Sequence, residues 1–303
     1  MRILAILFAF LLVLAPRSMA NGDRPGSEDS GVSILDSINE ELSARGLNAR
    51  VSKMEYFAIG EGRQGQTVFA NDRTLQLGTR WVPGDSRRGA VGDDITYLVD
   101  KSDGVATGGL ANSDTESAID RAMATWDTVS CSKLDIVKNT DFGQDPDIVD
   151  GFLGFGLVGN PFLADITQAG WLPKGFFDAL TPGGGDFILG VTFTFIFVAG
   201  GNPTDVDDNG FLDTALKEIY YNNNFPWAIN AAFPIDVETV ALHEAGHSLE
   251  LGHFGKIFRT DRNGKIHFAP RSVMNGPYSG IQQTLVGTDK AALCTLFAQW
   301  PHR

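Results

Sequence analysis

The segment at residues 243–253, HEAGHSLELGH, places three of the chain's five histidines and a glutamate within eleven positions. Because a helix turns about 100° per residue, His243 and His247 lie on one face of a helix, one turn apart. His253 would lie about 280° around that helix from His243, so it can join them only if the helix ends between them. Gly252 supplies a stop signal. The spacing therefore predicts a helix that breaks before His253 and three imidazoles that meet.

The same segment has the composition of a hydrolytic metal site. Neutral imidazoles suit zinc, and three protein ligands leave the fourth tetrahedral position open for water. Zinc lowers the pKa of such a water to about 7, and Glu244 is placed to take its proton. A competing interpretation is a core helix that happens to carry two histidines. The third histidine, His253, and a later methionine, Met274, argue against that interpretation.

Together, the HExxH pattern, the helix break, the third histidine and the later methionine resemble the metzincin metallopeptidases, and the wording VALHEAGHSLELGH is most similar to the matrixin branch. The resemblance implies an α+β fold with a mixed twisted sheet, a zinc-binding helix, a Met-turn and a C-terminal helix. It also assigns roles: the catalytic base is Glu244, the Met-turn residue beneath the metal is Met274, and the zinc ligands are His243, His247 and His253.

The function implied by this resemblance is a secreted zinc-dependent endopeptidase, a monomeric hydrolase acting on protein or peptide substrates. Glu244 would activate the zinc-bound water and later protonate the leaving amine. The alternative is a non-catalytic secreted metal-binding module of the same fold, in which Glu244 would have no purpose. Tyr278, shortly after the Met-turn, either shapes the specificity pocket, donates to the oxyanion, or simply packs.

Two departures from the family pattern concern the loops around the motif. The usual glycine three positions after the second histidine is Glu250 here, and a non-glycine residue is strained if the turn needs positive φ, unless Gly252 shifts the turn. The interval between His253 and Met274 is also longer than in the shortest matrixins. Within it, residues 258–270 predict a hairpin that borders the cleft, with Asn263–Gly264 at its tip.

The first twenty residues predict export. Residues 1–20 combine Arg2, an apolar run from Ile3 to Ala15, and a small-x-small cleavage site at Ser18–Met19–Ala20, as a signal peptide does. No later stretch offers the ~20 continuous apolar residues of a membrane span. The net charge of −13 argues against nucleic acid or an anionic membrane as partner, because both require clustered basic residues. We expect a secreted protein, extracellular or periplasmic.

The chain has two cysteines, Cys131 and Cys294. An oxidising compartment favours a disulfide between them, and two buried free thiols are the alternative. Neither cysteine precedes residue 81. The cysteine with which matrixin propeptides block the zinc therefore has no counterpart here.

The chain divides into a signal peptide, an N-terminal extension or prodomain at residues 21–80, and a metzincin-like catalytic domain at residues 81–303. The extension begins with a polar lead-in at residues 21–32. Whether it is removable or integral is left open by the sequence. Periodicity and turn residues predict helices at residues 33–46, 113–129 and 288–300, the second with a Ser113–Glu116 capping box, and strands at residues 51–60, 66–71, 94–100, 133–139 and 146–155.

The apolar run at residues 186–198 predicts a further strand just ahead of the zinc-binding motif. By resemblance it is the edge strand lining the cleft, where Leu189 to Phe193 would pair with the main chain of an extended substrate. The alternative is a buried central strand, and periodicity cannot distinguish the two.

A second metal signal lies at residues 205–213, DVDDNGFLD, which match the first half of an EF-hand loop. Leu216 stands where that loop needs a bidentate glutamate, so only a looser oxygen site, completed by Asp213 or Glu218, is expected. The alternative is a solvated acidic turn before a helix at residues 214–222. The candidate calcium ligands are Asp205, Asp207, Asn209 and Asp213.

Overall fold

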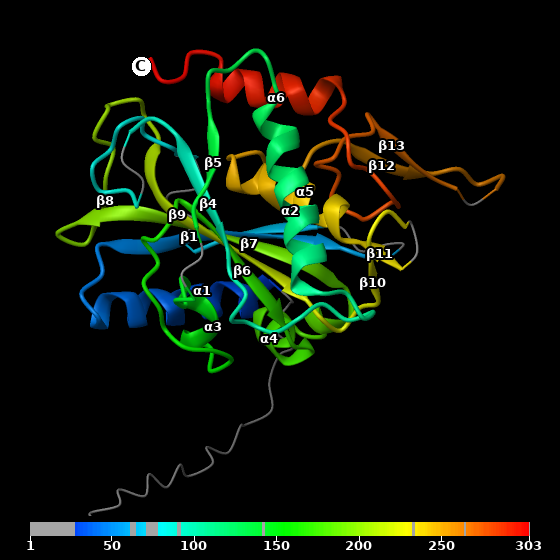
Figure 1. Ribbon diagram of the computed structural model, residues 1–303, viewed down its shortest axis with the longest axis horizontal. Helices are drawn as coiled ribbons and strands as arrows, with labels where there is room; N and C mark the ends of the chain where they lie inside the picture. The colour runs from blue at the N-terminus through cyan, green and yellow to red at the C-terminus, as the bar shows by residue number, and fades with distance from the viewer. Residues whose placement is uncertain are drawn as a thin grey trace, which may run out of the picture.

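The computed structural model describes residues 28–60, 65–70, 78–89, 92–140, 143–231, 234–263 and 265–302. Within these residues the chain is an α+β protein, with one large mixed sheet and helices on both of its faces (Figure 1). The expected signal peptide lies outside the described residues. So do most of the lead-in and the glycine at the expected hairpin tip.

The large sheet has nine strands. They are β1 Ala49–Ala58, β2 Gln66–Phe69, β3 Thr79–Arg80, β4 Ile95–Val99, β5 Ile136–Lys138, β6 Ile166–Leu172, β7 Ile188–Ala199, β8 Asn202–Pro203 and β9 Leu212–Asn222. The main path runs β2-β1-β7-β9-β6-β4-β5, while β3 pairs with β9 and β8 with β7. Strands β5, β4, β6 and β9 are parallel, and β7 is antiparallel to both of its neighbours.

Six α-helices form two layers around this sheet (Figure 1). They are α1 Glu28–Ala44, α2 Asn112–Asp127, α3 Val149–Phe152, α4 Lys174–Leu180, α5 Val237–Ser248 and α6 Gly287–Phe297. Helices α2, α5 and α6 pack in one hydrophobic core, and α1, α3 and α4 pack in a second. Alternate residues of β9 serve the two cores: Ile219 and Tyr221 face the first, Leu216 and Tyr220 the second.

The N-terminal extension is built into the sheet. Helix α1 buries Leu35, Ile38 and Leu42 at the predicted helical spacing, although it begins at Glu28, inside the expected lead-in. The predicted strands that follow it are confirmed as β1 and β2. Side chains of β1 enter both cores, with Phe57 in the first and Tyr56 in the second. Residues 28–58 therefore contribute to the packing of the whole molecule.

Helix α2 lies where expected, but its N-terminus is satisfied differently. The Oδ2 atom of Asp114 accepts a hydrogen bond from the backbone N–H of Ala111 at 3.2 Å, so the expected Ser113–Glu116 box is wrong. Glu116 instead forms an ion pair with Lys138 at 2.8 Å. The predicted apolar face is confirmed, with buried Ala118, Ala122 and Trp126.

Two predicted elements are wrong in type. Residues 214–222, expected as a helix, belong to β9, because pairing on both sides with β6 and β7 outweighs the helix propensity of Ala, Leu, Lys and Glu. Residues 146–155, expected as a strand, contain α3 instead. The backbone N–H groups of Ile148 and Val149 donate to the buried carboxylate of Glu218, each at 3.2 Å, and a carboxylate at that position favours a helix N-terminus.

Strand β7 confirms the predicted strand at residues 186–198 but is an interior strand and not the sheet edge. It pairs with β9 on one side and with β1 on the other. Met54, Tyr56 and Phe57 lie opposite Phe193, Val191 and Gly190, respectively, which is the stretch expected to receive a substrate. The buried central strand, the alternative left open by the sequence, is the observed arrangement.

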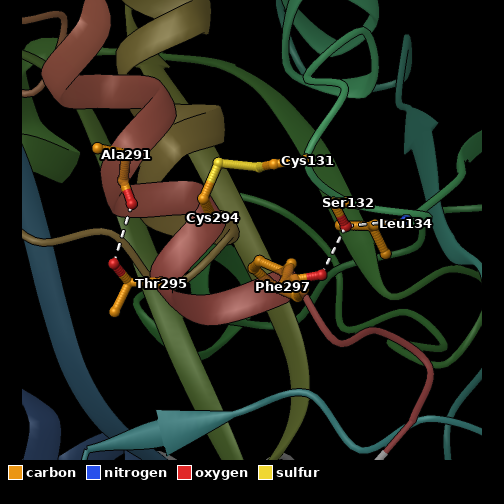
Figure 2. The surroundings of a disulfide bond; sticks show 7 residues. All are labelled: Cys131, Ser132, Leu134, Ala291, Cys294, Thr295 and Phe297. Carbon is orange, nitrogen blue, oxygen red and sulfur yellow. Dashed lines mark hydrogen bonds between the residues drawn. A yellow bond between two sulfur atoms is a disulfide. The ribbon is translucent and has the colours of Figure 1, made fainter.

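A disulfide joins Cys131, just after α2, to Cys294 in α6, which confirms the predicted pair (Figure 2). Beside it, the hydroxyl of Ser132 donates to the carbonyl of Phe297 at 2.9 Å. The closing helix at residues 288–300 is confirmed as α6, which buries Leu293 and Phe297. The disulfide thus connects α6 to the segment that leaves α2.

The remaining strands are short. Strands β10 Trp227–Ala228 and β11 Ile235–Asp236 pair in parallel just before α5. The predicted hairpin is confirmed as β12 Lys256–Arg259 and β13 Ile266–Ala269, which pair antiparallel. None of the helices in the described ranges is both long enough and apolar enough to cross a membrane.

Candidate metal centre

Helix α5 carries the first two histidines of the motif and is buried along its whole length. It begins at a side-chain cap, because the carboxylate of Asp236 accepts a hydrogen bond from the backbone N–H of Thr239 at 2.9 Å. It ends at Ser248, five residues before His253, as the angular argument predicts. The chain then turns back so that His253 faces the helix.

This turn is a Schellman motif centred on Glu250. The N–H of Glu250 donates to the carbonyl of His247, and the N–H of Leu251 donates to the carbonyl of Gly246, both at 3.0 Å. Glu250 has φ of 68°, the left-handed region that glycine usually fills. The left-handed turn therefore falls at Glu250, and the alternative, a shift of the turn to Gly252, is not observed.

The Glu250 side chain accounts for a non-glycine residue at this position. Its carboxylate is buried and lies 3.0 Å from the ammonium of Lys217, which is itself fully buried in β9. It also accepts hydrogen bonds from the hydroxyls of Thr214, at 2.5 Å, and Thr79. Burial alone would raise the pKa of Glu250, but Lys217 and Lys53 bring it below the ordinary value.

The three histidines meet as predicted. The Nε2 atom of His253 lies 3.2 Å from the Nε2 atoms of both His243 and His247. Nitrogen ligands in a tetrahedral zinc site, about 2.0–2.1 Å from the ion, lie roughly 3.3 Å from one another. Burial lowers the pKa of His243 and His247 well below the usual value, so both imidazoles are neutral at pH 7.

Backbone carbonyls orient two of these rings. The Nδ1 of His243 lies 2.7 Å from the carbonyl of Val273, and the Nδ1 of His247 lies 2.7 Å from the carbonyl of Leu251. Since a carbonyl only accepts, each Nδ1 carries the proton and each Nε2 presents its lone pair to the shared point. This is the tautomer that metal binding requires, and the residues present therefore fit zinc.

The predicted Met-turn packs against α5 from below the histidines. Gly246, between His243 and His247, lies so close to the sulfur of Met274 that a Cβ at this position would clash with it. The turn is held by Asp289 at the start of α6, whose carboxylate accepts hydrogen bonds from the N–H of Val273, at 3.1 Å, and from Ser272. The position of Val273, and through it that of His243, therefore depends on α6.

Glu244 follows His243 in α5 but is not part of the cluster that the three histidines form. Its Oε2 accepts a hydrogen bond from the hydroxyl of Thr192 in β7 at 2.6 Å, while its Oε1 is buried without a hydrogen-bond partner among the described residues. A Cβ at Gly190 would lie 2.9 Å from that Oε1, so the glycine leaves room for the carboxylate. Burial raises the pKa of Glu244 well above its usual value.

The centre is covered by the N-terminal extension. The ring of Phe57 stacks on His243, with centroids 3.8 Å apart and an interplanar angle of 12°. Gly65 packs against the third histidine, since a Cβ there would lie 2.6 Å from the Nε2 of His253. The backbone of Ala58 pairs with the segment after the Met-turn, accepting a hydrogen bond from the N–H of Tyr278 at 2.8 Å. As a result His243, Glu244 and His247 are inaccessible to solvent.

One charged residue of the extension also reaches the centre. Glu55 in β1 lies 3.5 Å from the Nδ1 of His247 and pairs with Lys53 at 2.7 Å. Sequence reasoning missed Glu55, Phe57, Gly65 and Thr192, because no local motif marks them. The one signal in the sequence is the apolar strand at residues 186–198, because an interior position for this strand requires a second strand, such as β1, beside it.

Tyr278 is anchored next to α5. Its hydroxyl accepts a hydrogen bond from the backbone N–H of Asp236 at 3.0 Å, and its ring meets Phe57 edge-on. Tyr278 therefore packs against Phe57 and holds the backbone of Asp236, the residue that caps the N-terminus of α5. A role toward a substrate stays a prediction.

The candidate calcium loop brings three of its four predicted ligands together. Asp205, Asp207 and Asp213 each present an oxygen within 4.8 Å of the others. However, Asp213 forms an ion pair with Arg87 at 2.7 Å, and Asp205 accepts the backbone N–H groups of residues 209 and 210. The fourth, Asn209, uses its side-chain oxygen to accept the N–H of Phe211. Calcium at this loop stays a prediction.

Comparison of the chain with protein-family models gives no match, and comparison with curated proteins gives no match either. The interpretation of the centre therefore depends on its residues and their geometry.

Proposed function

We propose that the protein is a secreted zinc-dependent endopeptidase of metzincin-like, matrixin-like architecture, in which zinc is held by His243, His247 and His253. The observation that carries the proposal is the cluster of three Nε2 atoms together with a buried carboxylate on the same helix, Glu244, which is hydrogen-bonded by Thr192. When bound, zinc would polarise the substrate carbonyl and lower the pKa of the attacking water.

Glu244 supplies the proton transfers in this proposal. Its unpartnered Oε1 accepts the proton of the attacking water and later returns it to the leaving amine, while Thr192 holds the other oxygen in place. The orientation of the carboxylate is thus set by β7 and not by the metal. General acid–base catalysis of this kind contributes typically about 10² to 10⁴-fold.

We propose further that the described structure is the closed form of this enzyme. An extended substrate pairs with a strand next to the metal, and β1 already occupies that edge of β7. Phe57 and Gly65 also cover the histidine cluster. Residues 21–80 would then act as a prodomain that blocks the cleft with a strand and needs no cysteine.

The second candidate function is a non-catalytic secreted module in which the three histidines hold a structural metal. The inaccessibility of His243 and His247 to solvent favours it. The buried carboxylate of Glu244, with one oxygen unpartnered, favours the enzyme, since a structural site has no use for it.

The test measures bound zinc and peptide hydrolysis together, in the wild-type chain and in a Phe57→Ala background that loosens the cover. Glu244→Gln should retain about one zinc per chain and lose about 10² to 10⁴-fold in turnover. His247→Ala should lose zinc and turnover together. Glu238→Gln is the matched control, because Glu238 lies on the same helix and pairs with Arg121 at 2.6 Å.

Two outcomes would contradict the enzyme. Zinc-loaded protein that hydrolyses no peptide in either background supports the structural module. Loss of zinc in Glu244→Gln would show that the carboxylate is a ligand and not a base.

A further inference from the structure

A second group of carboxylates lies between the loop after β4 and the start of α3. Asp100 follows β4, Asp103 lies in the loop toward α2, and Asp147 directly precedes α3. These three residues each offer an oxygen atom within 4.8 Å of the others. The sequence did not reveal the group, because Asp147 is more than forty residues from Asp100 and Asp103 and no ligand motif links the two segments.

A fourth carboxylate points into this group. Asp150 in α3 is fully buried, and its carboxyl lies close enough to those of Asp103 and Asp147 to raise the pKa of both. One of its oxygens accepts the N–H of Gly151 at 2.6 Å, and the other, Oδ2, has no hydrogen-bond partner. The Oδ2 atoms of Asp103 and Asp147 are likewise buried and unpartnered.

Such a group is unfavourable without a cation. Burying a carboxylate without a hydrogen bond or a counter-charge costs several kcal/mol by typical estimates, and here three neighbouring carboxyls each have a buried oxygen without a hydrogen-bond partner. Within the described part of the chain, no Lys or Arg forms an ion pair with Asp103, Asp147 or Asp150. The hydroxyl of Tyr220 lies 3.0 Å from Oδ1 of Asp147 and 2.8 Å from Oε2 of Glu218. Because the hydroxyl has a single proton, it can donate a hydrogen bond to only one of these two oxygens at a time.

We propose that Asp100, Asp103, Asp147 and Asp150 bind one calcium ion. The ligand set is all oxygen and mostly carboxylate, which suits a hard cation and not zinc. Calcium accepts six to eight oxygens in flexible geometry, whereas magnesium demands a near-ideal octahedron. The ion would join the loop after β4 to α3. This site is separate from the 205–213 loop and does not depend on the peptidase proposal.

The test uses calcium alone as the probe, added to the full zinc-loaded chain after dialysis against calcium-free buffer. Calcium at about 100 times its dissociation constant should raise the melting temperature by roughly 5 to 10 °C. Asp150→Asn should abolish the shift, and Asp103→Asn, at a less buried position, should abolish it without the risk of misfolding. Asp205→Asn is the control for the other acidic loop and should keep the part of the shift that Asp103→Asn and Asp150→Asn remove.

Three results would overturn the proposal. The first is a wild-type chain whose melting temperature does not change when calcium is added. The second is a shift that survives Asp103→Asn and Asp150→Asn but disappears in Asp205→Asn, which would place the ion at residues 205–213. The third is an Asp150→Asn variant that melts higher than wild type with calcium present, which would show that the carboxyls share protons instead of an ion.

Discussion

At Glu250, an interaction of the side chain compensates for an unfavourable backbone conformation. A non-glycine residue in the left-handed region is destabilised by about 1–2 kcal/mol. The carboxylate of Glu250, however, is the partner of Lys217, whose ammonium is fully buried. Removing one member of a buried ion pair costs about 3–5 kcal/mol. The ion pair therefore outweighs the backbone strain.

The two opposing energies at position 250 predict what a glycine there would do to stability. Glu250→Gly should relieve the strain at φ of 68° but leave Lys217 buried without its partner, for a net loss of about 1 to 4 kcal/mol in unfolding free energy. Urea unfolding of the variant and the wild type measures this change in unfolding free energy. The double variant Lys217→Met/Glu250→Gly should recover most of the loss. A Glu250→Gly protein as stable as wild type would contradict the assignment.

At the scale of elements, the histidine cluster was predictable from the sequence, and the strand that covers it was not. The three histidines lie within eleven residues, so one helix and its C-terminal turn determine their geometry. The pairing of β1 with β7 joins residues about 140 positions apart, as in the bond from Ser52 to the carbonyl of Thr194. No local pattern fixes such a register, which depends on packing in both cores.

The same limit explains the two misassigned elements. Residues 214–222 have helix-forming side chains, and only their place between β6 and β7 makes them a strand. The helix α3 depends on Glu218, a residue about seventy positions downstream of Ile148. In both cases a contact distant in sequence decides the local structure.

If β1 is an inhibitory strand, weakening its contact with the centre should increase activity. Phe57→Ala removes the ring stacked on His243, and we expect peptide hydrolysis to rise while the chain becomes about 3–5 kcal/mol less stable. Initial rates on a quenched peptide, with zinc content, measure this. Leu293→Ala is the control, because it opens a cavity in α6 away from β1 and should not raise hydrolysis.

An unchanged rate of hydrolysis in Phe57→Ala would contradict an inhibitory role for β1. A Phe57→Ala variant that is folded, retains zinc and hydrolyses peptide no faster than wild type would show that β1 is an integral strand. The substrate would then have to reach the centre by a path other than the edge of β7.

At the scale of the whole molecule, β1 and α6, which lie far apart in the sequence, both contribute side chains to the core around α5. Strand β1 pairs with β7 and places Phe57 over the histidines, while the Asp289 carboxylate at the start of α6 holds the N–H of Val273. The Cys131–Cys294 disulfide secures α6 by closing a loop with a sequence separation of 163. Loss of this link should therefore affect the stability of the centre as well as that of the fold.

The last prediction concerns this disulfide. The double variant Cys131→Ser/Cys294→Ser should be about 2–5 kcal/mol less stable in urea unfolding, because a cross-link that closes a long loop restricts the unfolded chain. Since α6 positions Val273 and through it His243, the variant should also release zinc at a lower urea concentration than wild type. Reduction of the wild-type protein should reproduce both effects, whereas the variant itself should not respond to reductant. Two titratable thiols in the native, unreduced protein would contradict the pairing, and unchanged zinc retention in the variant would contradict the coupling of α6 to the centre.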